Sequence, residues 1–557
     1  MLKTIITFKT LKYVILFGII FLAFFVRFHN LDKHFSHVDD LIAPSIGTMT
    51  VDDIIKKVNE KNIQINEELI RDTYPYFKPL IVAYGIAKGS TYAPLQFVFT
   101  GAIIDNKMEY HKILFYSRLI SFIVGFLSIL LILYISLKFY GKDNIIYSIL
   151  AVTILSLSWE HIIYSMQSES YTIGLFVVLL SFVIYIKYFF KENLNIKESF
   201  FLGSFLSLFI LSSYQFLFFL PGFYIAIFLS YTNNYKKFVS SYLLSIIIVI
   251  FTFGIEYFLF LSSSLSRGLN WNVGPNQEFM FNIYSQDSTL DYIFHFFSQN
   301  TYLVFRNLIS FANEGNIIND LFAVIYIFMF LLGIFSFLIS KNSLKKNFVV
   351  FFLVTVVIWV ILIIFQKITL SPTRHSLILL SFILIFTPAG MIYLFEKINI
   401  QKFLIIFPII TIVIFLLNYK SVINQRIDKF NPTHIEQLIT QYKVTGIYEY
   451  GWTRNLNFMT VVKDNFVESS INNMHAGETY FKHKTGKENN CILFITHRSL
   501  PLTNEMIQQY LEDINVEKKI NFKIIYKEEH TSNTEICFGN KTKNGTNSML
   551  LYIIKKG

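Results

Sequence analysis

The chain has 557 residues, of which 54% are hydrophobic and only 15% are charged. A soluble domain carries about 25% charged residues, so the charged fraction of this chain is low for a soluble protein. Apolar runs near the ~20-residue length that spans a membrane also recur along the chain. Together these two observations exclude an ordinary soluble protein. The net charge of +11 does not indicate nucleic-acid binding, because the lysines cluster between apolar runs as they do in cytoplasmic loops. The composition predicts an α-helical polytopic membrane protein.

The N-terminus has a basic start and then an apolar run from Tyr13 to Val26. A cleaved signal peptide needs a small-residue cleavage site, and the following sequence FFVRFHN offers none. We therefore interpret this run as a retained first membrane span.

Ten further apolar runs follow, so that eleven spans are predicted. They cover residues 11–27, 114–137, 145–159, 171–190, 199–213, 215–231, 238–262, 318–340, 347–366, 375–396 and 402–418. With the N-terminus in the cytoplasm, every inner connection carries lysine, whereas the short outer connection from Glu160 to Ser170 carries neither Lys nor Arg. The positive-inside rule therefore favours this orientation.

Three long polar segments then lie outside the cytoplasm: residues 28–113, residues 263–317 and residues 419–557. The first contains mixed charge with helical apolar spacing, which predicts one or two short surface helices. The last contains strand-like runs between turn signals, which predicts a soluble extracytoplasmic α/β domain after a transmembrane domain of residues 1–418. Cys491 and Cys537 both lie in this last segment, either as a disulfide or as two unpaired thiols.

The stretch FHNLDKHFSHVDDLIAPS follows the first span and ends in adjacent carboxylates, Asp39 and Asp40. A carboxylate with a tuned pKa can act as a general base for a hydroxyl; taken alone, however, the pair reads as solvated loop charge. The spacing of His29, His34 and His37 does not match a zinc site. We predict no metal and no cofactor.

Two features follow on the outer side. Pro94 precedes an apolar helical stretch in TYAPLQF, as proline suits a helix start; this predicts either a surface helix beneath a lipid-substrate cavity or a plain re-entry into the membrane. Arg118 lies inside the start of an apolar span. Such an arginine usually faces a cavity or partner, and snorkelling to the interface is the alternative.

The sequence WEHIIYSMQSESY places Glu160, His161, Glu169 and Tyr171 around a short outer turn. Glu169 stands at the mouth of a span and is a candidate for the same cavity. The alternative is a polar turn between two spans.

The sequence FQKITLSPTRHS holds Lys367, Arg374 and His375 at the mouth of a late span. This short outer loop carries Lys and Arg, whereas the other short outer connections carry neither. Guanidinium pairs bidentately with phosphate, so the loop predicts either a site for a phosphate-bearing lipid or a helix-end anchor.

In their order along the chain, these motifs resemble the GT-C superfamily of membrane glycosyltransferases, over residues 10 to about 400. The nearest branch is the group of protein O-mannosyltransferases and aminoarabinose transferases, which use polyprenyl-phosphate-linked sugars. Asp39 and Asp40 fall on the family's Asp-Glu pair, with a shorter second side chain. Ala93 replaces a proline of the family's Pro-Pro-Leu motif. Further matches fall on Arg118, Ser121, Gly125, Tyr164, Ser165, Tyr171, Arg374 and His375.

The resemblance implies an enzyme that transfers a sugar from a polyprenyl-phosphate donor to a glycan, lipid or protein acceptor outside the cytoplasm, with inversion. It implies Asp39 as base with Asp40 beside it. The implied donor-phosphate residues are Arg374, His375, Arg118 and Lys78, and the implied cavity residues are Glu169, Tyr171, Tyr164, Tyr92 and Pro94. We expect a bacterial cell (inner) membrane. The alternatives are a lipid-linked glycan flippase or transporter, and a surface-glycan polymerase or ligase.

Overall fold

The computed structural model describes nearly all of the apolar helices and a C-terminal sheet. The described residues are 8–29, 31, 48, 50–52, 55, 67–87, 93–105, 107–141, 144–189, 191, 193–231, 235–261, 290–311, 317–365, 368–370, 374–426, 432–450, 462, 465–469, 478–485, 491–496, 522–532 and 547–556. The chain divides into two compact units. The first is Met1–Leu31, Asp72–Phe99 and Arg118–Val422, and the second is Asp32–Arg71, Thr100–Ser117 and Ile423–Gly557.

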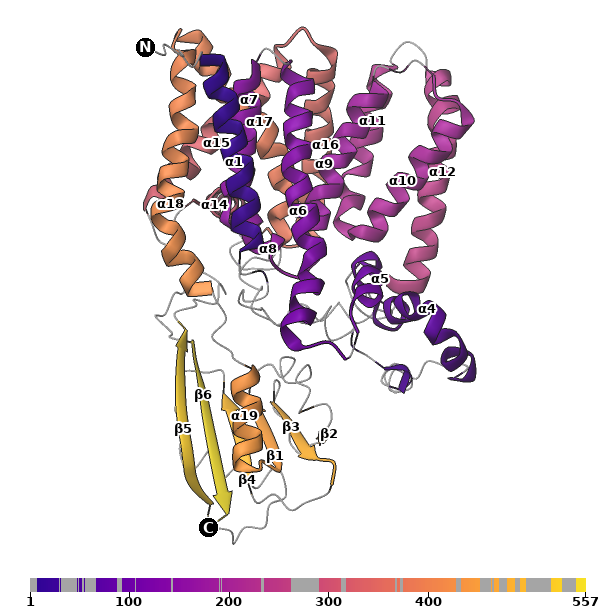
Figure 1. Cartoon of the computed structure of the whole chain (residues 1–557). Coiled ribbons are helices and arrows are strands. Elements are labelled where there is room, and N and C mark those ends of the chain that lie inside the picture. The colour runs from indigo at the N-terminus through magenta and orange to yellow at the C-terminus, as the bar shows by residue number, and fades with distance from the viewer. Residues whose placement is uncertain are drawn as a thin grey trace, which may run out of the picture. The chain divides into compact units, whose positions relative to one another are not determined.

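Seven helices in the described part of the chain are long and apolar enough to cross a membrane. All seven belong to the helical bundle of Figure 1. They are α1 (Phe8–Phe28), α6 (Tyr110–Tyr140), α9 (Tyr171–Phe189), α12 (Tyr235–Glu256), α15 (Ile317–Leu338), α16 (Ser343–Ile364) and α17 (Leu380–Lys397). The chain is therefore a helical polytopic membrane protein.

An eighth span forms if α7 (Ile145–Leu157) and α8 (Trp159–Ser165) are one span bent by 61°. Ser158 makes the bend, because its side chain accepts from the backbone N–H of His161 and so caps α8. Its hydroxyl also donates to the Leu308 carbonyl at 2.6 Å. The bend is thus tied to a later helix by a side-chain hydrogen bond.

The other three predicted spans coincide with helices whose apolar parts are no longer than 17 residues. They are α10 (Ile196–Ser212), η3 (Tyr214–Phe218) with α11 (Leu220–Ser230), and η7 (Gln401–Ile405) with α18 (Ile406–Arg426). A capping box between Asn195 and Glu198 starts α10, and its 17 residues are fewer than a typical span needs. Helix length and apolar composition together support seven or eight spans in the described part of the chain, and eleven stays a prediction.

Three further helices lie in segments predicted to be outside the cytoplasm. The helix α4 (Glu67–Ala87) begins in the mixed-charge stretch, and α5 (Pro94–Ile103) begins at the proline. At ten residues α5 is too short to span. The amphipathic helix α14 (Leu290–Leu308) was not predicted.

The closest helix pair is α15 with α17, and glycine makes it possible. A Cβ at Gly390 would stand 1.8 Å from the Met329 carbonyl oxygen, and one at Gly333 would stand 1.8 Å from that of Phe386. The two backbones therefore touch at positions where only glycine fits.

The second unit contains a six-stranded sheet and the helix α19 (Pro432–Tyr442). The strands are β1 (Gly446–Tyr450), β2 (Phe466–Ser469), β3 (Glu478–His483), β4 (Cys491–Thr496), β5 (Phe522–Ser532) and β6 (Asn547–Lys556). Their order is β2-β3-β1-β4-β6-β5, with β1 and β4 parallel and the other pairs antiparallel. The strand-like runs seen in the sequence correspond to β4, β5 and β6.

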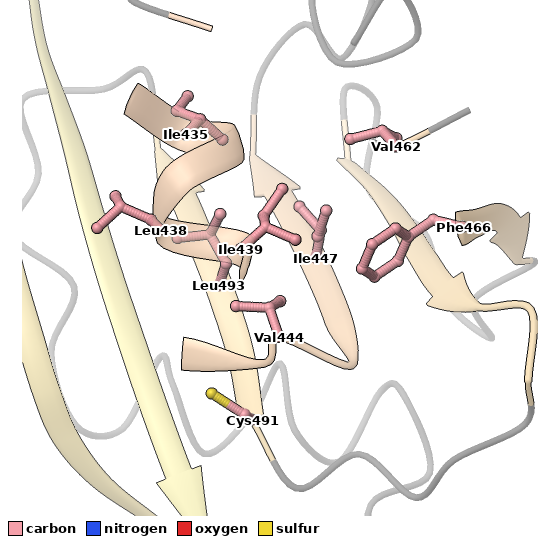
Figure 2. Close-up of a cluster of buried hydrophobic side chains, with 9 residues drawn as sticks. All are labelled: Ile435, Leu438, Ile439, Val444, Ile447, Val462, Phe466, Cys491 and Leu493. Atoms are coloured by element: carbon pink, nitrogen blue, oxygen red, sulfur yellow. The ribbon is translucent and has the colours of Figure 1, made fainter. Parts of the chain in front are cut away.

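An apolar core joins α19 to the central strands. Ile435, Leu438 and Ile439 lie at helical spacing on one face of α19 and are buried with Ile447 of β1 and Leu493 of β4 (Figure 2). Cys491 is buried in the same core, and Cys537 lies outside the described residues. Both alternatives, a disulfide and two unpaired thiols, therefore stay open.

Candidate functional site

A fully buried arginine closes the junction of α1, α7 and α8. Arg27 lies in the last turn of α1, and one of its nitrogens, Nη1, donates to the carbonyls of Ala23 and Ser156, both at 3.0 Å. Its Nη2 donates to the Leu155 carbonyl at 3.2 Å and to His161 Nδ1 at 2.8 Å. The last carbonyls of a helix lack partners within that helix, so Arg27 supplies the donors that α7 needs where it bends.

The Nδ1 atom of His161 has two possible partners. It lies 2.8 Å from Arg27 Nη2 and 3.2 Å from the Leu155 carbonyl oxygen, so it accepts from the guanidinium in one tautomer and donates to the carbonyl in the other. The ring is fully buried, and Nε2 has no hydrogen-bond partner among the residues that the structure describes. His161 therefore belongs to the same buried junction as Arg27.

Arg118 holds the chain that leaves α1. Its side chain in α6 is fully buried, and Nη1 donates to the Leu31 carbonyl at 2.8 Å. Leu31 precedes Asp39 by eight residues. The full burial of Arg118 argues against snorkelling to the membrane interface. Its hydrogen bond to Leu31 anchors the backbone that leads toward Asp39 and Asp40.

The turn between α8 and α9 is held by side chains from two other helices. Gln96 of α5 donates to the Ser168 carbonyl, and Ser121 of α6 donates to the Glu169 carbonyl at 3.2 Å. Glu169 is only 3% exposed. Because Ser121 lies one helical turn after Arg118, these contacts bring Glu169 to the same face of α6 as that arginine.

Aromatic contacts link the region of the α8–α9 turn to η6 (Arg374–Leu379). Tyr171 meets His375 edge to face, with ring centres 5.4 Å apart, and lies 5.8 Å from Tyr164. Gln215 donates to the His375 carbonyl at 3.2 Å. A Cβ at Gly125 would stand 2.3 Å from the Ser165 hydroxyl, so glycine lets α6 approach this turn.

These contacts define one group of residues, which we call the polar cluster. It comprises Gln96, Arg118, Ser121, Tyr164, Glu169, Tyr171 and His375. All lie in the first compact unit, and they come from α5, α6, α8, the α8–α9 turn, α9 and η6. Pro94 begins α5 two residues before Gln96 and is buried.

The other predicted site residues are not part of this group. Asp39, Asp40 and Tyr92 lie outside the described residues, as does the side chain of Arg374, whose backbone begins η6. Lys78 is half-buried on α4. Within the described residues, no three His, Cys, Asp or Glu side chains are grouped so as to hold a metal ion.

The sequence interpretation did not include Arg27 or Glu256 of α12. Both are ionisable residues within apolar helices, where a charge usually marks a partner or a cavity. That rule was applied to Arg118 and would have found these two residues as well. No protein-family model matches the chain, and no curated protein matches it either.

Proposed function

We propose that this chain is an integral membrane glycosyltransferase of GT-C type. It transfers a sugar from a polyprenyl-phosphate donor to a glycan, lipid or protein acceptor at the extracytoplasmic face. In this proposal the chain has eleven spans, a cytoplasmic N-terminus and an extracytoplasmic C-terminal domain. The lysines of the inner connections support this orientation.

The observation that supports the proposal is the polar cluster. Residues separated by up to 279 positions, from Gln96 to His375, contact one another through the α8–α9 turn. Polar groups inside a membrane bundle usually face a substrate or ion path. The chain segment that leads to Asp39 is held at the same helix, α6, by Arg118.

The proposed reaction is a single displacement. The Asp39 carboxylate takes the proton of the acceptor hydroxyl or amine, and the acceptor oxygen or nitrogen bonds to the anomeric carbon. The bond from that carbon to the phosphate oxygen breaks, and polyprenyl phosphate leaves. Arg374, Lys78 and Arg118 are the cations proposed to stabilise the charge that develops on the phosphate. Attack opposite the leaving group inverts the anomeric configuration.

Purified protein in proteoliposomes, with a polyprenyl-phosphate sugar, tests these roles. Asp39→Asn is expected to lower transfer about 10²- to 10⁴-fold, and Arg374→Ala about 10²- to 10³-fold. Asp105→Asn is a matched control, because this exposed carboxylate accepts only from the Lys107 N–H among its described contacts, and asparagine keeps that acceptor. Unchanged transfer in both Asp39→Asn and Arg374→Ala would reject the site.

A comparison of glycans and lipid-linked intermediates in knockout and parent cells by mass spectrometry tests the function itself. Loss of one sugar from a glycan, lipid or protein is expected. An unchanged glycome together with a changed sidedness of the lipid-linked intermediate would identify a flippase instead.

A further inference from the structure

An apolar groove lies between α11 and α12. Its volume is about 280 Å³. Leu217, Leu220 and Tyr224 line it from η3 and α11, and Val249, Ile250 and Phe253 line it from α12. Ile250 is 64% exposed on the outside of the bundle. The groove therefore opens toward the bilayer, and a lipid chain is the occupant that the bilayer supplies.

A buried carboxyl lies at one end of this groove. Glu256 follows Val249 by seven residues and Phe253 by three, so it continues the groove-lining stripe of α12. It is 2% exposed, and neither carboxyl oxygen has a hydrogen-bond partner among the described residues. A buried acid without a partner is costly in an apolar environment.

The other wall of the groove ends in a phenol. Tyr214 precedes Leu217 by three residues in η3, and side chains three apart eclipse in a 3₁₀-helix. Its hydroxyl is buried without a partner in the described part of the chain, as are both carboxyl oxygens of Glu256. Tyr214 and Glu256 therefore each continue one wall of the groove with an unpartnered polar group.

The hydroxyl of the groove-lining residue Tyr224, in contrast, already has a hydrogen-bond partner. It is 3.2 Å from Ser245 Oγ. The winding of α12 also changes here, because the π-helix η4 (Tyr257–Leu261) begins directly after Glu256. Such irregularities occur frequently at functional sites.

Charge complementarity identifies the head group. Among the described residues, no side chain or backbone N–H donates to either carboxyl oxygen of Glu256. Two acceptor oxygens and a phenol oxygen suit a group that carries positive charge and several N–H donors. We propose that the groove binds an aminolipid, with its chain between α11 and α12 and its primary ammonium on Glu256 and Tyr214. This site is independent of the proposed sugar transfer.

The test uses the full chain in nanodiscs and native mass spectrometry, with four probe lipids that share the same acyl chains. Phosphatidylethanolamine is expected to be retained about tenfold more than phosphatidylcholine, because a trimethylammonium keeps the charge and has no N–H. Phosphatidylglycerol and diacylglycerol test an anionic head and a bare hydroxyl. Retention of phosphatidylcholine equal to that of phosphatidylethanolamine, or preferred retention of either other probe, would overturn the proposal.

Variants locate the site. Glu256→Gln and Tyr214→Phe are each expected to lower phosphatidylethanolamine retention, Glu256→Gln by about tenfold. Leu217→Trp fills the groove and is expected to reduce retention further. Ile361→Trp is the matched control, since Ile361 is 45% exposed on α16 and lies outside the groove. If Glu256→Gln does not fold, Tyr214→Phe and the lipid comparison on the unaltered chain still test the proposed site. Unchanged phosphatidylethanolamine retention in both Tyr214→Phe and Leu217→Trp would place the lipid elsewhere.

Discussion

Two buried ionisable residues, one on the packed side of the bundle and one on its open side, differ in their hydrogen-bond partners. On the packed side, around α7, α8 and α17, Arg27 fills four acceptors. On the open side, Glu256 leaves both oxygens without a partner among the described residues. The most apolar stretch of α17 is 83% buried and that of α12 is 22% buried. The hydrogen bonds of Arg27 stabilise the fold, whereas the unpartnered carboxyl of Glu256 is where we expect a ligand or a proton.

The largest effect is expected at the closest helix contact. Gly390→Ala puts a Cβ 1.8 Å from the Met329 carbonyl oxygen, so α15 and α17 must separate and the free energy of unfolding should fall by about 3 kcal/mol or more. Gly254→Ala in α12 is the matched control. A Cβ there meets nothing within 4 Å, and alanine should stabilise that helix by about 0.5–1 kcal/mol. Thermal unfolding in detergent measures the stability of both variants. Equal unfolding midpoints for Gly390→Ala and Gly254→Ala would contradict the difference in packing around the two glycines.

The next effect is expected at the α1–α7–α8 junction. Arg27→Ala removes four hydrogen bonds and leaves the carbonyls of Leu155 and Ser156 buried. The free energy of unfolding should fall by about 3 kcal/mol. Arg27→Lys should recover only part of this loss, because an ammonium has no planar fork with which to reach the same acceptors. Full stability in Arg27→Ala would mean that the bend holds without the guanidinium.

The smallest effect on stability is expected at Glu256. Glu256→Gln removes no described hydrogen bond, so the free energy of unfolding should change by less than about 1 kcal/mol in detergent without aminolipid. The measurement is the same thermal unfolding. A loss comparable with that of Arg27→Ala would show that Glu256 is structural and would remove the contrast between the two sides.

Helix positions were predictable from the sequence because each apolar run is long enough to be seen by itself. The sheet strands β4, β5 and β6 were predictable for the same reason. The helix α14 was not, since only one of its faces is apolar and its segment reads as a polar loop. The number of spans stays open because η3 and η7 take up residues of two predicted spans in tighter winding.

The polar cluster was predictable residue by residue, but its contacts were not. Glu169, Tyr171 and His375 were candidates from the sequence alone, yet nothing in local spacing indicates that Tyr171 meets His375 about 200 positions later. The partners of Arg27 lie 128 to 134 positions away, except for one local carbonyl. Long-range partners depend on how the helices pack, and periodicity along the chain does not encode that. The roles of Asp39 and Asp40 stay predictions.

The contacts of Arg27 also impose a waiting time during synthesis. The acceptors on α7 and α8 are made 128 to 134 residues after the guanidinium. At about 5–20 residues per second, the ribosome needs roughly 6–27 seconds to produce them. Over that interval the first span carries a charge with one local carbonyl as partner. The insertion machinery or interfacial water must hold α1 until the bend between α7 and α8 arrives and draws the arginine inside.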